Sequence, residues 1–479
     1  MRSAVSYGAG AISHGALTHS RFHLIHIGVM KLSRKTKIWV LLCGDILALY
    51  LSLCVAIAIR YQSAWRMAFW EYHLVPFTVI FPLWIAIFYI AGLYDLPHLR
   101  NNIDFIKKLS LTLFVNALLT ITIFYFVPYF GIAPKTNLFL FILAFGLCEI
   151  WWRRTWNIRA SFRDGLNRVL LLDDSPQAKE VVDELAKNPQ IGYGINVWLK
   201  QGFENAQPDH LRTLVRDHEI NLIIVPHHTK NSHEAGRVFY DLLALGVEVI
   251  DLPSFYESIF RKVPLSDIHE WWFLENRIGQ KKFYDDLKKG IEFVCALALL
   301  VLLSPFLLVI ALLVKLTSPG PAVLGQTRIG KGGTPFTLYK FRSMKALAAD
   351  GSAETNGAVW SGTNDSRVTP LGRLLRYSHL DELPQLVNIL KGELSFIGPR
   401  PERPEIVKQL IPKIPFYEIR LLVKPGVTGW AQINYRKDQT DEDVREKLQH
   451  DIYYLKNRSM ILDVAIVLKT LKAFFVNHQ

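Results

Sequence analysis

The sequence contains only four cysteines in 479 residues, and their placement excludes several protein classes. All four lie in apolar stretches, far apart and without a Cys-x-x-Cys spacing: Cys43, Cys54, Cys148 and Cys295. Isolated cysteines in such surroundings behave as small buried hydrophobic residues. The chain is therefore not a disulfide-stapled secreted scaffold, the spacing predicts no cysteine metal site, and the polar parts are expected in a reducing compartment.

Residues 1–29 lack the continuous apolar core and cleavage site that define a signal peptide. We expect this segment to be a disordered extension, or to be present in the sequence only because a start codon was assigned too far upstream. In the whole chain, half of the residues are apolar, 20% are charged and the mean hydropathy is +0.18. These values exclude a disordered or collagen-like chain, and the length indicates about three modules.

The apolar residues are concentrated in blocks in the first third of the chain. Four blocks approach the ~20 residues that a helix needs to cross a bilayer. They comprise residues 38–59, 74–93, 109–130 and 138–152. Basic residues precede the first and third blocks and follow the fourth, whereas the opposite loops carry few. By the positive-inside rule, residues 30–155 are predicted to form a four-helix transmembrane bundle with both ends in the cytoplasm.

A fifth apolar run, residues 293–316, is interrupted midway by Ser304-Pro305. Proline removes a backbone donor and kinks a helix. Lysines and arginines flank the run on both sides, which argues against crossing, because one basic flank would then lie outside. We therefore favour a re-entrant helix that enters the membrane and returns to the cytoplasmic face, with a spanning helix as the alternative.

Residues 165–265 show a different pattern, in which short predicted strands alternate with helices. The strands are expected at residues 168–172, 195–199, 222–226 and 247–252. This alternation predicts a parallel, Rossmann-like α/β domain. A dinucleotide site would need a glycine-rich loop after the first strand, but Asp173 and Asp174 stand there. We therefore expect a structural or regulatory domain rather than a nucleotide site.

The motifs that indicate chemistry all follow residue 284. Lys340 and Arg342 alternate along a predicted strand, and two cations on one face need an anionic partner such as phosphate. Asp381 and Glu382 are adjacent; one carboxylate can be a nucleophile in phosphoryl chemistry while the other holds Mg²⁺. Arg400 stands between two prolines, so it loses little entropy when it binds a phosphate. Taken separately, these patterns also fit a solvated basic face, acidic residues at a helix start or a helix-terminating loop.

Five segments in fixed order resemble the bacterial sugar transferases that move a sugar phosphate from a nucleotide sugar to a polyprenyl phosphate. They are Gln326-x-Arg328-Ile329-Gly330, Lys340-Phe341-Arg342-Ser343-Met344, Leu380-Asp381-Glu382-Leu383-Pro384-Gln385, Gly398-Pro399-Arg400-Pro401 and Lys424-Pro425-Gly426-Val427-Thr428-Gly429-Trp430-Ala431-Gln432. The similarity covers about residues 284–479 and implies a mainly α-helical, monotopic catalytic domain with a re-entrant membrane helix. The whole chain, a multidomain membrane protein, is similar to the long form of the family, the undecaprenyl-phosphate glucose or galactose phosphotransferases.

The resemblance also implies residue roles. Asp381 would be the nucleophile and Glu382 the Mg²⁺ ligand, with Asp381 as a second candidate ligand. Substrate phosphates would be bound by Lys340, Arg342, Arg376 and Arg400. Further substrate contacts are expected from Gln326, Arg328, Asp365, Arg367 and His379. Many family members have serine where this chain has His379; this difference leaves the implied roles of Asp381 and Glu382 intact, but the family pattern does not define the substrate contact at His379.

The implied reaction takes a UDP-sugar and undecaprenyl phosphate and yields undecaprenyl-diphosphate-sugar and UMP. It would be the first membrane step of exopolysaccharide, capsule or O-antigen synthesis. The implied location is the bacterial inner membrane, with the catalytic domain of the multi-pass chain in the cytoplasm and membrane lipids as further partners. The sequence does not name the sugar, and it leaves open whether the chain forms a homodimer.

Other functions fit the sequence less well. A membrane-anchored ligand sensor or scaffold with an inactive transferase domain would be favoured by a glycine loop in the α/β domain, or by loss of Asp381 or Arg400. A transporter would need charged relays within its spans, and the sequence is interpreted as having none. The net charge of +13 would suit nucleic acid. However, the basic residues cluster beside membrane segments, where anionic lipid accounts for them, so no nucleic-acid partner is expected.

Overall fold

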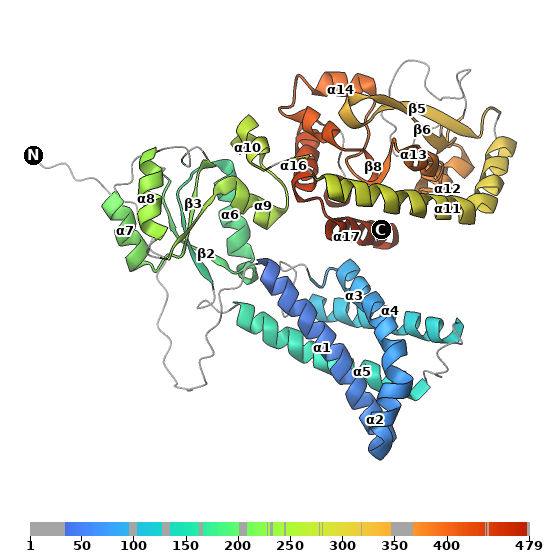
Figure 1. Ribbon diagram of the computed structural model, residues 1–479, viewed down its shortest axis with the longest axis horizontal. Coiled ribbons are helices and arrows are strands. Elements are labelled where there is room, and N and C mark those ends of the chain that lie inside the picture. Colours follow the sequence, from blue (N-terminus) through green and yellow to red (C-terminus); the bar gives the residue numbers. More distant parts are fainter. Residues whose placement is uncertain are drawn as a thin grey trace, which may run out of the picture.

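The computed structural model describes residues 34–94, 103–126, 135–161, 166–200, 208–227, 229, 233–243, 246–276, 278–279, 281–317, 319–345, 367–435, 437 and 440–476. The extension expected at residues 1–29 lies outside these ranges. The described elements form a bundle of helices, an α/β module and a C-terminal domain built around one long helix, α11 (Lys282–Thr317) (Figure 1). The chain is mostly helical, and its sheets are small.

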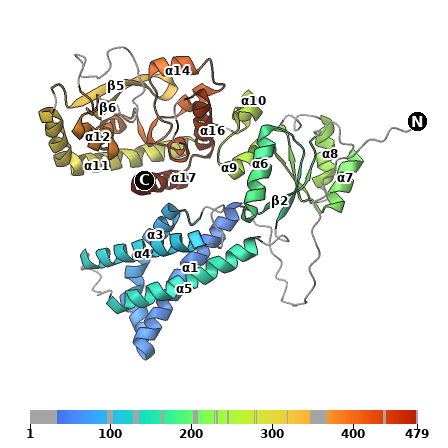
Figure 2. The ribbon, with the colours of Figure 1, turned by 180° about the vertical axis from the view of Figure 1, so that it is seen from behind.

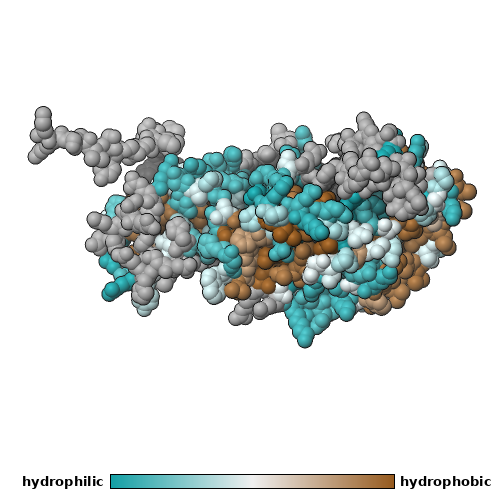
Figure 3. All heavy atoms as spheres, turned by 90° about the horizontal axis from the view of Figure 1, so that it is seen from above, coloured by the Kyte–Doolittle hydropathy of each residue, from teal (hydrophilic) through white to brown (hydrophobic). Residues whose placement is uncertain are grey.

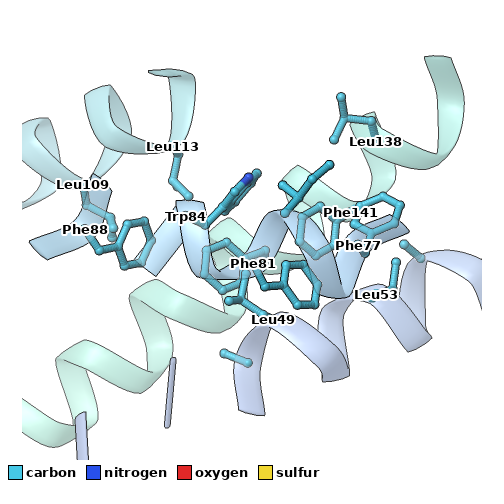
Figure 4. Packing of buried hydrophobic residues seen from close by; sticks show 14 of the residues in the cluster. Leu49, Leu53, Phe77, Phe81, Trp84, Phe88, Leu109, Leu113, Leu138 and Phe141 are labelled. Atoms are coloured by element: carbon cyan, nitrogen blue, oxygen red, sulfur yellow. The ribbon is translucent and has the colours of Figure 1, made fainter. Parts of the chain in front are cut away.

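The bundle contains four long helices: α1 (Arg34–Tyr61), α3 (Leu74–Ala91), α4 (Ile103–Phe126) and α5 (Lys135–Ser161). The short α2 (Trp65–Met67) and a π-helical turn, Ala68–His73, join the first two. The core of the bundle is aromatic: Phe77, Phe81 and Trp84 of α3 pack against Phe141 of α5 (Figure 4). Offset and edge-to-face ring pairs stabilise such a core beyond the burial of area alone.

Three stretches of the described residues are helical, long and apolar enough to cross a membrane: Thr36–Ala91, Phe105–Tyr125 and Lys282–Thr317. The first contains the first predicted span and all but the last two residues of the second, and the second stretch overlaps the third predicted span. Helix α5 covers the fourth predicted span but is not among the three. Its apolar run is interrupted by Glu149, Arg153 and Arg154.

A buried network of charges joins α1 to α5, and it corrects the interpretation that the predicted spans carry no charged relay. Arg153 forms ion pairs with Asp45 and, at 2.8 Å, with Glu149, and all three side chains are fully buried. Tyr94 and Trp152 donate hydrogen bonds to the two oxygens of Asp45, at 2.7 and 3.2 Å. Arg153 supplies the cation shared by the two acidic side chains, and a buried carboxylate without such a partner would destabilise the fold.

The α/β module contains four parallel strands in the order β2-β1-β3-β4. Their bounds are β1 (Asn167–Leu171), β2 (Tyr193–Trp198), β3 (Leu222–Val225) and β4 (Glu248–Asp251). The helices are α6 (Pro176–Lys187), α7 (Pro208–Asp217), α8 (His233–Leu243) and α9 (Leu252–Phe260). One core packs α6 and α9 on one face of the sheet, and a second packs α7 and α8 on the other (Figure 2).

The acidic turn after β1 has a structural role. Asp173 accepts a hydrogen bond from the backbone N–H of Ser175 at 2.7 Å, and the Ser175 side chain caps the N-terminus of α6. A side-chain cap of this kind satisfies helix N–H groups that would otherwise lack partners. His227 lies beside Asp251 at 3.4 Å, but no set of three ligands suited to a metal ion occurs among the described residues.

The C-terminal domain follows the short α10 (Glu270–Glu275). Its strands are β5 (Val323–Ile329), β6 (Pro335–Phe341), β7 (Ser395–Ile397) and β8 (Gly426–Thr428). Its helices after α11 are α12 (Pro370–Tyr377), α13 (Gln385–Lys391), α14 (Pro404–Leu410), α15 (Trp430–Asn434), α16 (Asp441–Asn457) and α17 (Met460–Val476). Strands β5 and β6 form an antiparallel hairpin, and β7 pairs with β8 in parallel.

Helix α11 has apolar sides and is tied to the C-terminal domain at both ends. Near its N-terminal end, Glu292 accepts hydrogen bonds from Ser395 and from the backbone N–H of Phe396, at 2.5 and 3.0 Å. At its C-terminal end, Arg342 donates to the carbonyls of Val314 and Pro319. Between these two sets of hydrogen bonds, most of the α11 surface is exposed. Hydrophobic residues cover the end of the molecule where α11 lies (Figure 3).

Pro305 lies inside α11, and Figure 1 shows the helix bending before its C-terminal end. Proline cannot donate to the carbonyl four residues earlier. The hydroxyl of Ser304 donates to that carbonyl, of Val301, at 2.8 Å. The Ser-Pro pair thus bends the helix while satisfying the backbone oxygen that the proline leaves without its usual donor, a condition for helical backbone in hydrocarbon.

Candidate active site

The carboxylates Asp381 and Glu382 lie on a single 3-10 turn, Leu380–Glu382, between α12 and α13. His379 precedes the turn with a φ of 52°, a left-handed conformation in which histidine is enriched relative to most residues. The backbone N–H of Glu382 closes the turn by donating to the carbonyl of His379 at 3.2 Å. His379 thus separates α12, which ends at Tyr377, from the turn that carries the two acids.

A close contact between backbones holds α12 in place. Thr369 caps the helix by accepting from the N–H of Gly372 at 2.9 Å, and its own N–H donates to the carbonyl of Ser343 at 3.1 Å. A Cβ atom on Gly372 would lie 1.9 Å from that same carbonyl oxygen, so only glycine fits here. From the last turn of α12, Arg376 donates to the Ser343 hydroxyl at 2.8 Å, which fixes its guanidinium beside the acids.

Asn388 attaches α13 to the β5–β6 hairpin. It thereby helps to hold in place the 3-10 turn with Asp381 and Glu382, which lies just before α13. Its fully buried amide donates to the carbonyl of Thr337 at 2.6 Å and accepts from the N–H of Tyr339 at 3.1 Å. A further bond joins it to Glu393 at 2.7 Å. A buried amide with all of these partners fixes the position of the helix more strictly than apolar packing alone.

The hairpin contributes cations to the same site. Lys340 and Arg328 both donate to the side-chain oxygen of Gln326, at 3.5 and 2.8 Å. Arg328 also donates to the carbonyl of Pro401 at 3.0 Å, which links the hairpin to the turn that carries Arg400. Arg400 itself lies 3.4 Å from Glu382.

The cations and the acids shift one another's protonation. Burial, together with the neighbouring Glu382 carboxylate, raises the pKa of Asp381 to about 6, although Arg376, His379 and Lys340 oppose the shift. Burial and the charges of Arg328 and Arg376 lower the pKa of Lys340. Groups with pKa values moved towards neutrality by burial and specific neighbours are typical of catalytic sites.

Arg420 is a component of the site that the motif analysis did not single out. It is buried, donates to the backbone carbonyl of Arg400 at 3.0 Å and to the hydroxyl of Tyr417 at 2.7 Å, and lies 3.0 Å from Asp451. It therefore anchors the Arg400 turn to α16. No local pattern identifies it, because the contact depends on residues distant in the sequence.

The structure separates Arg342 from the other predicted phosphate ligands. Its side chain is 2% exposed, and its guanidinium caps the end of α11. Cations near a helix C-terminus interact favourably with the free carbonyls and the helix dipole. The strand periodicity placed Arg342 beside Lys340, but Arg342 follows the last residue of β6, Phe341, and its guanidinium binds carbonyls at the end of α11.

The remaining predicted substrate contacts, Asp365, Arg367 and His379, are found in different places. Asp365 lies outside the described residues. Arg367 bonds through its carbonyl to the N–H of Lys345 beside the bridge between Met344 and Val368. His379 is exposed and lines the site, as do Arg376, Glu382 and Arg400.

These polar residues open into a cavity of about 720 Å³ whose other walls are apolar. Three helices contribute to the apolar walls, with Leu299 and Leu303 from α11, Leu386 and Ile389 from α13, and Val467 and Leu471 from α17. The site thus combines a charged end with an apolar slot. This arrangement suits a ligand that carries both a phosphate and a hydrocarbon chain.

Asp381 and Glu382 form an oxygen donor set that fits Mg²⁺. Mg²⁺ is commonly held by one or two carboxylates together with substrate phosphates and water. Two adjacent carboxylates, one of which raises the pKa of the other, would be stabilised by such a cation. The described residues contain no third carboxylate, histidine or cysteine grouped with them, so the phosphates would have to supply further ligands.

Comparison with known proteins identifies the C-terminal domain. Residues 283–477 match the family described as "Bacterial sugar transferase". An Aeromonas hydrophila protein named UDP-N-acetylgalactosamine-undecaprenyl-phosphate N-acetylgalactosaminephosphotransferase is 40% identical over 229 residues, which are 47% of this chain and 52% of that protein. The UDP-glucose:undecaprenyl-phosphate glucose-1-phosphate transferase of Escherichia coli (strain K12) is 43% identical over 194 residues, 40% of each chain.

A third relative is shorter. The exopolysaccharide production protein PSS of Rhizobium leguminosarum bv. phaseoli is 38% identical over 192 residues, which are 38% of this chain and 92% of that protein. The chain thus spans only about half, or less, of the length of the first two relatives but nearly all of this one.

Proposed function

The chain belongs to the bacterial sugar transferase family, and from this premise we propose that it transfers a sugar 1-phosphate from a UDP-sugar to undecaprenyl phosphate. The products would be undecaprenyl-diphosphate-sugar and UMP. The observation that carries the proposal is the cavity in which Glu382, the neighbour of Asp381, and Arg400 meet an apolar slot. The polar end suits a diphosphate, and the slot suits the isoprenoid chain of the acceptor.

In the first step, an oxygen of Asp381 attacks the β-phosphorus of the UDP-sugar, the bond to the α-phosphate oxygen breaks, and UMP leaves. A sugar-phosphoryl aspartate remains. Arg376 and Lys340 would stabilise negative charge on the transferring group, since both lie close enough to Asp381 to affect its pKa. In the second step, a phosphate oxygen of undecaprenyl phosphate attacks the same phosphorus and releases the Asp381 carboxylate.

Two steps at one nucleophile allow the two substrates to bind in turn, which corresponds to a ping-pong scheme. Glu382, and with it Asp381, would hold Mg²⁺, which supplies charge neutralisation on the phosphate oxygens. The 3.4 Å contact between Arg400 and Glu382 supports a role for the Arg400 guanidinium in binding the same phosphates. Arg420 holds the backbone of that arginine in place.

We propose that α11 is a re-entrant membrane helix. A straight helix of 36 residues would be about 54 Å long, more than a bilayer core requires. Both ends of α11 bind the same domain, through Glu292 and Arg342, and the helix contains Pro305 and bends before its C-terminal end. Together with the basic residues on both flanks, this supports a helix that enters the cytoplasmic leaflet and returns.

For the rest of the chain we propose a four-span bundle, a Rossmann-like module and a location in the bacterial inner membrane, with the α/β and catalytic domains in the cytoplasm. The exposed apolar residues of α1 and α4 support the four-span bundle. The parallel order β2-β1-β3-β4, with helices on both faces, supports the Rossmann-like module. We propose a role in exopolysaccharide, capsule or O-antigen synthesis, as the name of the Rhizobium relative suggests.

The test is UMP release from the purified full chain with undecaprenyl phosphate and one UDP-sugar at a time. Release that requires both the lipid and Mg²⁺, with one sugar preferred, is the expected result. UDP-glucose and UDP-N-acetylgalactosamine are the first sugars to try, because the relatives carry these names. Absence of release with every sugar tested would favour a scaffold with an inactive transferase domain.

The pH dependence of UMP release is expected to show an acidic limb near pH 6. The nucleophile must be ionised, and the raised pKa of Asp381 means that the reactive carboxylate is lost as the pH falls through about 6. We expect kcat/KM to fall about tenfold per pH unit below that value. Replacing Lys340 with Met removes a cation that opposes the shift, so the limb should move to higher pH. A limb near pH 4 in the wild type, or a downward shift in K340M, would contradict the assignment.

Arg420→Gln is expected to lower kcat/KM by about 10–100-fold by loosening the Arg400 turn, since Arg420 is a positioning residue. The variant also leaves buried Asp451 without its cation, so apparent Tm should fall as well. Arg445→Gln is the matched control, because Arg445 donates only to a surface carbonyl. If R420Q loses stability but keeps the wild-type ratio of kcat to KM for the nucleotide sugar, the positioning role is wrong.

A further inference from the structure

A second cavity, of about 900 Å³, lies where the bundle, the α/β module and the C-terminal domain meet. We call it the junction cavity. Figures 1 and 2 show α17 between the C-terminal domain and the bundle, where it contacts α3. The cavity is lined on one side by α1 and α3 and on the other by α17, with α9 and the turn between α16 and α17 at its polar end. It is separate from the cavity that contains Glu382 and Arg400.

The walls of the junction cavity are apolar and partly open to the surroundings. The face of α17 that lines it carries Ile461, Val464, Ala465 and Leu468, spaced as one helical stripe. Ile461 and Val464 are 75% and 57% exposed, and Trp39 on the α1 side is 57% exposed. In the proposed membrane placement these side chains face the bilayer, so hydrocarbon can enter the cavity from the side.

The polar end of the cavity carries an excess of positive charge. Glu257 is already satisfied, because Lys456 lies 2.6 Å from one of its oxygens and Asn457 donates to the other at 2.7 Å. Arg261 also lines the cavity, and its side chain has no ion-pair partner among the described residues. Among Glu257, Lys456 and Arg261, the polar end of this otherwise apolar cavity therefore has one more cation than anions.

We propose that the junction cavity binds one anionic phospholipid of the surrounding bilayer. Its phosphate would be held by Arg261 and Lys456, and its acyl chains would lie between α1, α3 and α17. A negatively charged amphiphile is the ligand class that matches apolar walls open to the membrane together with an unmatched arginine. The proposal rests on the membrane placement proposed above and does not depend on the transferase reaction.

Binding at this cavity would affect the active site through α17. Val467, Thr470 and Leu471, on another face of the same helix, line the catalytic cavity. Thr470 is hydrogen-bonded to Thr428 of β8 at 2.8 Å, which joins the helix to the catalytic domain. A lipid packed on one face of α17 would hold the wall of the catalytic cavity in place, so anionic lipid is expected to raise the rate of UMP release.

The experiment is native mass spectrometry of the delipidated full chain with phosphatidylglycerol or phosphatidylcholine of the same acyl chains. We expect one phosphatidylglycerol to bind about tenfold more tightly than phosphatidylcholine, as a charge-assisted contact predicts. Arg261→Gln should remove most of this preference, whereas Arg237→Gln, an exposed arginine of the same module, should keep it. Ala465→Trp fills the cavity and should abolish the adduct, with Leu118→Trp on the exposed face of α4 as its control.

Equal binding of the two lipids, an unchanged preference in R261Q, or an intact adduct in A465W would each overturn the proposal. Displacement of the phosphatidylglycerol by stoichiometric undecaprenyl phosphate would also overturn it, because the occupant would then be the isoprenoid. UMP release is measured in parallel. Specific lipid binding without UMP release would contradict only the transferase function, and UMP release without specific lipid binding would contradict only this inference.

Discussion

Asp381→Asn is expected to lower the rate of UMP release by about 10³-fold or more while the protein remains in the membrane. The substitution keeps the shape of the side chain but removes the charged nucleophile. The wild type, incubated with UDP-sugar alone, should gain the mass of one sugar phosphate on the peptide that contains Asp381. The variant should show no such adduct. Asp286→Asn, on the exposed side of α11, is the matched control and should behave as wild type.

The same substitution is expected to stabilise the fold. The pKa of Asp381 is raised from 3.8 to about 6, so the folded protein binds a proton more tightly than the unfolded chain. The ionised carboxylate therefore reduces the free energy of unfolding progressively as the pH rises from about 4 to above 6. At neutral pH, D381N should be more stable by about 1–2 kcal/mol, after allowance for partial exposure. Turnover within tenfold of wild type would contradict the nucleophile assignment, whatever the change in stability.

Arg153→Met is expected to reduce the free energy of unfolding by about 3–5 kcal/mol, because it leaves Asp45 and Glu149 buried without a cation. The apparent Tm of the full chain in detergent should fall by about 10 °C. Arg60→Met, at the exposed end of α1, serves as the control and should leave Tm nearly unchanged.

A neutral version of the network tests the reason for this loss. The triple variant Asp45→Asn, Glu149→Gln, Arg153→Met has no unpaired charge and should recover much of the lost stability. If the single R153M variant is as stable as wild type, or if the triple variant is less stable than the single one, the charge network does not hold α1 to α5. Activity per folded molecule should change little, because the network lies in the bundle.

Much of the secondary structure and part of the site can be predicted from local sequence. The four parallel strands occur within two residues of the ranges predicted for them, since alternating strands and helices leave strong periodic signals. The motifs also named Glu382 and Arg400, whose side chains lie 3.4 Å apart, and Asp381 next to Glu382. The catalytic roles of these residues remain predictions.

Other features could not be predicted, since they depend on packing between distant segments. Arg342 is two residues from Lys340 in the sequence, but its guanidinium binds carbonyls at the C-terminal end of α11 instead. Nothing in the sequence indicated that the charged residues of the bundle interact, because Asp45 and Arg153 are separated by 108 positions. Only helix packing brings them within contact distance.

The sequence alone determined where the apolar segments lie, which residues carry the carboxylates and cations, and which family the catalytic domain resembles. These properties depend on residue type and local spacing, which folding does not change. Tertiary structure decided which cations reach Asp381 and which act as caps, how Arg420 holds the Arg400 turn, and that α17 separates two cavities. Burial and distance between remote side chains arise only when the elements pack, so they are properties of the folded molecule.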